Sequence, residues 1–190
     1  ENSDKILGHL IESLKTLNIY DNVNIIIVSD HGMVDVSDDR VVNIDDFNIS
    51  GKVYGKGPIM SLMQTKSDND IVDFMIPNVT IVSAKNNQEL NYNNPIYNFL
   101  LIADEGWMMY TNDDLKKYNG KLPVRGMHGY DSKSLNMHAI FYAYGPLFKK
   151  NMTIDTFELI HIYPLLCKLL DINPYIDIDG DINVLSKTLK

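Results

Sequence analysis

Several features that are common in proteins are scarce or absent in this sequence of 190 residues. Cys167 is the only cysteine, so no disulfide can form within the chain. The formal net charge is -8, whereas proteins that hold a duplex nucleic acid present basic surfaces to its phosphates. We therefore expect no duplex DNA or RNA partner.

Long apolar segments are also missing. No apolar run approaches the roughly 18 residues that a membrane-spanning helix needs, and the opening "ENSDKILGHL" lacks the regions of a signal peptide. We expect no membrane segment in this chain, which begins with Glu1 and not with Met. The sequons at Asn48, Asn78 and Asn151 are compatible with a secreted glycoprotein.

The chain contains enough apolar residues, 45%, for one domain with a substantial core. Residues 4–18 show helical spacing of apolar side chains, which predicts an amphipathic helix docked on that core. Residues 22–28 are rich in Val and Ile and end in four consecutive branched apolar residues, which is typical of a parallel strand covered on both faces. These patterns predict an α/β fold, with a mainly parallel sheet flanked by helices.

The same alternation recurs towards the end of the chain. Residues 139–146 predict a buried strand and residues 154–172 a helix, in which Pro164 either causes a kink or marks a start closer to itself. Cys167 lies in this apolar helix, which favours a buried structural thiol. Further short strands are expected at 58–65, 79–84, 98–104 and 107–111.

The stretch "SDHGM" directly follows the apolar run at 22–28. Binding groups of α/β sheets gather where strands end, and Asp and His are ordinary zinc ligands. Asp30 and His31 can reach one ion only where the strand has become a loop, and Gly32 supplies the conformational freedom for that change. Alone, the motif is equally consistent with Asp30 capping a turn.

A second candidate is His128 in "RGMHGYD", where the flanking glycines place a histidine on a loop that can approach a ligand closely. Other acidic residues lack ligand-like spacing, and calcium binding is not expected because the EF-hand pattern is absent. They are interpreted as solvated loop residues: Asp38, Asp39, Asp45 and Asp46.

Five motifs in order, "IIIVSDHGM", "ADEGW", "GMHGYD", "NMHAIFYAYGPLFK" and "HIYPLLCKLLDINP", resemble the nucleotide pyrophosphatase/phosphodiesterase family of the alkaline phosphatase superfamily. The resemblance implies an alkaline phosphatase-like fold and a catalytic domain with two zinc ions. Asp30 and His31 match the ligands of one ion, and His128 matches a ligand of the other. The family's cysteines usually pair, so a partner for Cys167 is expected elsewhere or has been lost.

The remaining zinc ligands of the family and its Thr or Ser nucleophile have no counterpart here. We therefore expect residues 1–190 to be the C-terminal portion of a phosphodiesterase catalytic domain, with a sheet incomplete at its N-terminus. Without the missing N-terminal half, the chain should bind zinc weakly and should not hydrolyse phosphodiesters, since zinc sites need three or four protein ligands. The resemblance implies an extracellular protein acting on a nucleotide or a choline phospholipid.

Two other interpretations remain open. One is a non-catalytic relative that retains the fold as a binding or interaction module, and an upstream nucleophile would distinguish it from the enzyme. The other is a sulfatase or phosphomutase of the same superfamily, which the "ADEGW" and "HGYD" stretches disfavour. Aromatic side chains beside a sheet are more often core than pocket lining, and this applies to Trp107, Tyr110 and Tyr130.

Overall fold

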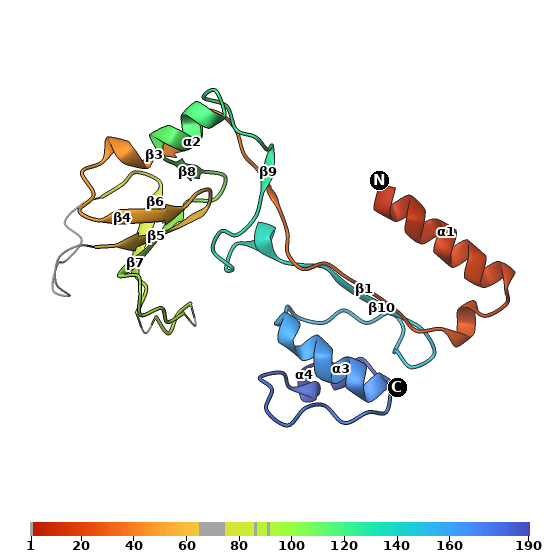
Figure 1. Cartoon of the computed structure of the whole chain (residues 1–190). Coiled ribbons are helices and arrows are strands. Elements are labelled where there is room, and N and C mark those ends of the chain that lie inside the picture. The colour runs from red at the N-terminus through yellow and green to blue at the C-terminus, as the bar shows by residue number, and fades with distance from the viewer. Residues whose placement is uncertain (1, 65–74, 86, 91) are drawn as a thin grey trace. The chain divides into compact units, whose positions relative to one another are not determined.

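The computed structural model of this chain describes residues 2–64, 75–85, 87–90 and 92–190. The chain forms two compact units, one made of residues 1–30 and 140–190 and the other of residues 31–139. Helices and strands occur in both units, which confirms the α/β class (Figure 1). Within the described residues, no helix combines the length and apolar character required to cross a membrane.

A two-stranded antiparallel pair organises the first unit. Strand β1 (Ile25–Val28) pairs with β10 (Phe141–Tyr144), so that Ile26 lies opposite Ala143. One face of the pair packs on a small apolar core around Phe148, Leu165 and Leu185. Leu165 and Leu185 belong to the helices α3 (Ile162–Leu169) and α4 (Ile182–Ser186), which lie beside each other in Figure 1.

The predicted strand at 22–28 exists, but its expected parallel pairing is wrong. In the described part of the chain, β1 pairs antiparallel with β10, and its residues are half-buried or exposed. An apolar run indicates that a strand tends to be buried by other elements, but it does not specify whether the neighbouring strand runs parallel or antiparallel. Parallel pairing is found instead between β3 (Val41–Asn43) and β8 (Met108–Tyr110).

The predicted N-terminal helix is confirmed as α1 (Asn2–Thr16), but its docking on a core is not. None of its residues is buried, and Ile6 and Leu10 are 70% and 49% exposed. In Figure 1, α1 stands apart from α3 and α4. Helical spacing shows that an apolar stripe exists, whereas the partner that covers the stripe depends on tertiary structure.

The C-terminal helix starts close to Pro164, as one of the two sequence interpretations proposed. A 3-10 turn (Leu159–His161) leads into α3, and Pro164 lies in its first turn, where a missing N–H costs no intrahelical bond. Cys167 is buried, as expected. His161 Nδ1 accepts a hydrogen bond from the Asp181 backbone N–H at 2.9 Å, which ties the start of α3 to the start of α4.

A four-stranded antiparallel sheet in the order β4-β5-β7-β6 forms the centre of the second unit. All four short strands expected from the sequence are present. Three are in this sheet, and the fourth is β8. The elements of the second unit not yet given bounds are β2 (Val34–Asp35), β4 (Lys52–Gly55), β5 (Ile59–Met63), β6 (Val79–Ser83), β7 (Phe99–Ala103), α2 (Asn112–Lys117) and β9 (Gly126–Met127), with short 3-10 turns at Ile44–Asp46 and Leu135–Met137; Tyr20–Asn22 forms a further 3-10 turn in the first unit.

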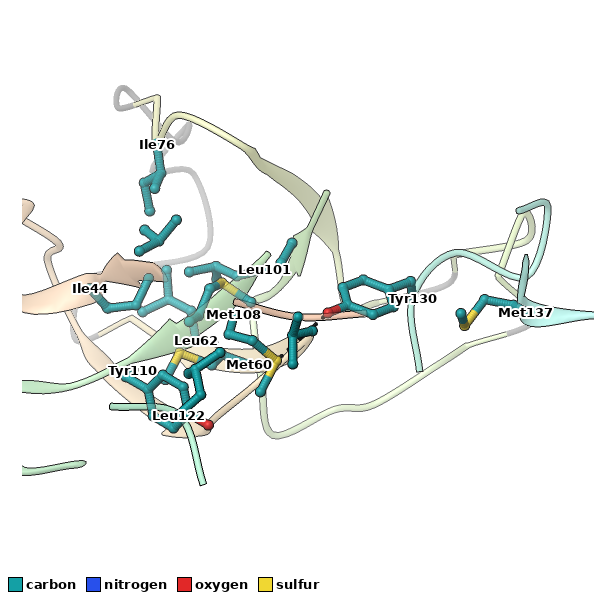
Figure 2. Packing of buried hydrophobic residues seen from close by; sticks show 14 residues of the cluster. Ile44, Met60, Leu62, Ile76, Leu101, Met108, Tyr110, Leu122, Tyr130 and Met137 are labelled. Carbon is teal, nitrogen blue, oxygen red and sulfur yellow. Dashed lines mark hydrogen bonds between the residues drawn. The ribbon is translucent and has the colours of Figure 1, made fainter. Parts of the chain in front are cut away.

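The main hydrophobic core lies in this second unit. Fully buried side chains from β5, β7 and β8, including Met60, Leu62, Leu101 and Met108, meet at its centre (Figure 2). Tyr130 reaches this cluster from the "HGYD" segment, with its hydroxyl directed towards it. The core therefore extends from the sheet to the segment that carries His128.

In the core of the first unit, two neighbouring leucines of α3 should differ strongly in what their replacement by alanine costs in stability. Leu165 is fully buried, whereas Leu166 is 40% exposed. Leu165→Ala should lower the free energy of unfolding by about 2–5 kcal/mol, because it leaves a cavity, and Leu166→Ala should cost less than about 1 kcal/mol. Urea denaturation of both variants measures the difference, and equal losses would contradict this packing.

Candidate metal centre

His31 and His128 are brought together by a short antiparallel ladder. In this ladder β2 pairs with β9, with Val34 opposite Met127 and Asp35 opposite Gly126. His31 precedes β2 and His128 directly follows β9, so both histidines emerge at the same end of the ladder. A backbone bond from the Val36 N–H to the Arg125 carbonyl at 3.0 Å continues the ladder beyond Asp35. On the other side, the Gly32 N–H donates to the Met137 carbonyl at 2.9 Å, which fixes the backbone next to His31.

The two imidazole rings are stacked. Their centroids are 3.7 Å apart and their planes differ by 17°. His31 is half-buried and His128 is exposed. The His31 Nδ1 lies 2.8 Å from the Gly32 carbonyl oxygen, which can only accept a hydrogen bond. Nδ1 must therefore carry the hydrogen in this contact, so Nε2 is the nitrogen whose lone pair suits a metal ion.

Gly32 is required for a reason other than the one expected from the sequence. Its φ is not in the left-handed region, so conformational freedom is not what the position needs. A Cβ there would overlap the Asn136 carbonyl oxygen and lie 2.9 Å from the His138 carbonyl oxygen. Close approach of two backbone segments is thus what excludes a side chain beside His31.

Asp30 lies where the sequence placed it, just after the end of β1. It is exposed and belongs to the first unit, and Ser29 before it exchanges two hydrogen bonds with Ile140. The Ser29 N–H donates to the Ile140 carbonyl at 3.3 Å, and the Ile140 N–H donates to Ser29 Oγ at 3.0 Å. These bonds fix the backbone next to Asp30. The sharing of one ion by Asp30 and His31 stays a prediction.

Asp38 is exposed in a turn, as expected, but it also has specific partners that were not expected from the sequence. Its carboxylate accepts two hydrogen bonds from Arg125, from Nη1 at 3.0 Å and Nη2 at 3.1 Å, and one from the Leu122 N–H at 2.7 Å. The Arg125 donors, followed by the Leu122 N–H, lower the pKa of Asp38 below its ordinary value. The segment after His31 is thereby tied to the segment before His128. Arg125 in "RGMHGYD" was the sequence feature from which a partner for Asp38 could have been predicted.

The other acidic residues also have local partners. Asp45 accepts a hydrogen bond from the Asn112 N–H at 2.7 Å at the start of α2, and Asp46 accepts one from Asn43 Nδ2 at 2.7 Å. A hydrogen bond from Ser37 lowers the pKa of Asp39. They remain exposed, as expected, but each helps to fix a turn.

The aromatic residues confirm the core interpretation. Tyr110 and Tyr130 are buried, and Trp107 packs against the same cluster. The Tyr130 hydroxyl donates to the Trp107 carbonyl at 2.9 Å, and burial raises the pKa of Tyr130 to about 12. Tyr130 is therefore a neutral hydrogen-bonded anchor for the loop that carries His128.

The donor set partly fits a zinc site. Two imidazoles meet, and the Gly32 carbonyl orients the ring of His31 as the outer partner of a metal-binding histidine usually does. Among the described residues, however, no group of three His, Cys, Asp or Glu side chains is arranged to hold an ion. Zinc needs three or four protein ligands, so these residues fit as part of a metal centre.

The family model for type I phosphodiesterase / nucleotide pyrophosphatase matches residues 1–131 of the chain, which include both histidines and Asp30. The chain belongs to this family. The resemblance inferred from the five motifs is therefore confirmed.

Relatives within the phosphodiesterase family are similar over most of this chain. A bis(5'-adenosyl)-triphosphatase of Xenopus laevis is 32% identical over 89% of the chain, and human ectonucleotide pyrophosphatase/phosphodiesterase family member 5 is 33% identical over 89%. These matches cover 38% and 36% of the two relatives. The chain thus spans little more than a third of their length.

Solved structures of the same family give the same result for the fold. Human family member 5 superposes with a TM-score of 0.79 at 28% identity, and the match covers all of this chain and 51% of that one. An inactive variant of murine family member 5 in complex with AMP superposes with a TM-score of 0.81 at 29% identity. The expected family fold is therefore confirmed.

The contacts of Gly32 predict the cost of a single methyl group. Gly32→Ala should destabilise the protein by about 1–3 kcal/mol, because the new Cβ cannot avoid the backbone of Asn136. Gly8→Ala is the control, since a Cβ at Gly8 meets nothing within 4 Å and alanine favours a helix by about 1 kcal/mol. Urea denaturation should show opposite shifts for the two variants, and a neutral Gly32→Ala would refute the close approach.

The Asp38 contacts predict a dependence on pH. Because its pKa is lowered in the folded state, Asp38 stabilises the fold above its ordinary value of 3.8, and this contribution is lost as the pH falls through the lowered pKa. The stability difference between the parent and Asp38→Asn should be constant above about pH 5 and shrink in stronger acid. Asp113→Asn, at a carboxylate that is 95% exposed, should show no comparable trend. A difference that is independent of pH would contradict the pairing with Arg125.

Proposed function

We propose that this chain is part of a zinc-dependent phosphodiesterase/nucleotide pyrophosphatase, which hydrolyses phosphodiester or pyrophosphate bonds. The observation that carries the proposal is the pair of stacked histidines, which come from two separate loops of a chain that belongs to this family. Members similar to it are named as phosphodiesterases and triphosphatases. The proposal extends that chemistry to this protein.

In this proposal the metal centre has two zinc ions. Asp30 and His31 bind one ion, and His128 binds the other. The further ligands and the Thr or Ser nucleophile come from residues outside these 190, so this chain alone is inactive. The lack of a three-ligand group among the described side chains supports this division.

The chain's own residues orient and hold these groups. The Gly32 carbonyl fixes the ring of His31, and the ladder between β2 and β9 keeps His128 next to it. When bound, two zinc ions would lower the pKa of the attacking hydroxyl or water and neutralise charge on the phosphoryl oxygens. Preorganised ligands make that charge stabilisation effective, because little reorganisation is then needed during the reaction.

For the substrate we propose a nucleotide in preference to a choline phospholipid. Among the relatives are bis(5'-adenosyl)-triphosphatases, and a structure of murine family member 5 is a complex with AMP. We also propose an extracellular location, which the names ectonucleotide pyrophosphatase and venom phosphodiesterase support. Asn48 and Asn151 are exposed, as sites of glycosylation would have to be.

Histidine substitution in the protein at its natural length tests the proposal. His31→Ala and His128→Ala should each lower hydrolysis of a nitrophenyl phosphodiester at least about 100-fold, because loss of a ligand exceeds the 10–100-fold effect of losing an outer partner. Chelation of zinc should abolish activity, and added zinc should restore it in the parent.

His9→Ala is the matched control, because His9 is an exposed residue of α1. It should retain full activity and bind as much zinc as the parent. Activity that survives both histidine substitutions and the chelator would refute the enzyme proposal. A parent protein that neither binds zinc nor hydrolyses the ester would instead support the non-catalytic binding module.

A further inference from the structure

The "ADEGW" turn contributes the Trp107 carbonyl to the site described above, but its Glu105 has no role there yet. It connects β7 to β8, and the Trp107 N–H donates to the Asp104 carbonyl at 2.9 Å to close it. The Asp104 N–H donates to the Asn78 carbonyl at 2.8 Å. The turn is therefore anchored to the sheet and the main core from both ends.

Glu105 at the tip of this turn binds the loop that follows His128. Its carboxylate accepts hydrogen bonds from Ser134 Oγ and Asn136 Nδ2. The Ser134 donor, followed by Asn136, lowers the pKa of Glu105, so the charged form that accepts both bonds is favoured. Lys133, in the same loop, pairs with Glu89, but Glu105 is the acidic group that holds Asn136.

Asn136 connects Glu105 to His31. The carbonyl oxygen of Asn136 is the atom that a Cβ at Gly32 would overlap, and the next carbonyl, of Met137, accepts the Gly32 N–H at 2.9 Å. The Gly32 carbonyl in turn accepts the hydrogen of His31 Nδ1. A displacement of Asn136 would therefore move the backbone that orients the His31 ring.

The same turn contacts the segment after His31 through Gly106. This glycine has φ +83°, and a Cβ there would collide with the Arg40 guanidinium. Arg40 Nη2 donates to the Asp35 carbonyl at 3.0 Å, and Asp35 belongs to β2. Trp107 provides the contact with the other histidine segment, because its carbonyl accepts a hydrogen bond from the Tyr130 hydroxyl in the His128 loop. The turn thus contacts both histidine-bearing segments.

We propose that Glu105 is a positioning residue for the metal centre, which sets the relative placement of the His31 and His128 rings by holding Ser134 and Asn136. The proposal rests on the proposed function for its consequence, which is zinc affinity. The effect of Glu105 on the placement of the two rings does not depend on the proposed function, because it is expected whether or not zinc binds. Glu105 itself touches neither ring, and it acts through the backbone of the loop.

The test uses the protein at its natural length with its histidine rings labelled with carbon-13. Stacked aromatic rings shift each other's NMR signals, so the metal-free parent should show displaced ring signals for His31 and His128. Glu105→Ala should move both sets towards the positions of exposed histidine. Glu105→Gln keeps an oxygen acceptor and should stay close to the parent, because an amide can still pair with Asn136 or Ser134.

Zinc affinity, measured by competition with a chelator, provides the second readout. Glu105→Ala should weaken zinc binding about 10–100-fold, as the loss of an outer partner does, and Glu105→Gln should weaken it less than about 3-fold. Asp113→Asn removes an exposed carboxylate of α2 that pairs with Lys116 in the same helix, and it should change neither readout.

Each result has a definite meaning. Unchanged ring signals and unchanged zinc affinity in Glu105→Ala would overturn the positioning role. If Glu105→Ala fails to fold, Ser134→Ala removes one of the two donors and should shift the same signals in the same direction, and its failure to do so would equally overturn the proposal. Failure of the proposed function would look different, because zinc binding would then be insensitive to His31→Ala and His128→Ala while the ring signals still responded to Glu105.

Discussion

The short antiparallel contact between β2 and β9 is the constraint on which the candidate metal centre depends. It pairs only a few residues, but the bond from the Val36 N–H to the Arg125 carbonyl continues it, and the bond from the Gly32 N–H to the Met137 carbonyl fixes the backbone next to His31. In an antiparallel ladder, the chain that enters one strand runs beside the chain that leaves the other, and residues diagonal to each other share a face. This geometry brings His31 and His128 together from positions far apart in the sequence.

So short a ladder cannot persist alone, since isolated two-stranded pairs are marginal in water. The core of the second unit supplies the missing stability through Tyr130, whose ring is buried and whose hydroxyl is bonded to Trp107. The bidentate pair between Asp38 and Arg125 adds a link at the other end of the ladder. Gly32 permits the close approach of the Asn136 and His138 backbone beside His31.

Several strands and the family could be predicted from the sequence, whereas features that depend on partners distant in the sequence could not. The strands at 58–65, 79–84, 98–104 and 107–111 have local apolar patterns, and the motifs identified the family. The direction of β1 and the exposure of α1 depend on partners that no local pattern specifies. The stacking of the two histidines was not foreseen, because it follows from the pairing of β2 with β9, whose two-residue strands carry almost no periodic signal. The pairing of the exposed Asp38 with Arg125 was not foreseen, because Arg125 lies far along the chain.

The central claim is that His31 and His128, held by this ladder, are zinc ligands. The most direct measurement is an anomalous diffraction map at the zinc absorption edge, from zinc-loaded crystals of the protein at its natural length. The account predicts two zinc peaks, one about 2 Å from His31 Nε2 and one about 2 Å from a ring nitrogen of His128. Zinc peaks remote from both rings, or no bound zinc at all, would contradict it.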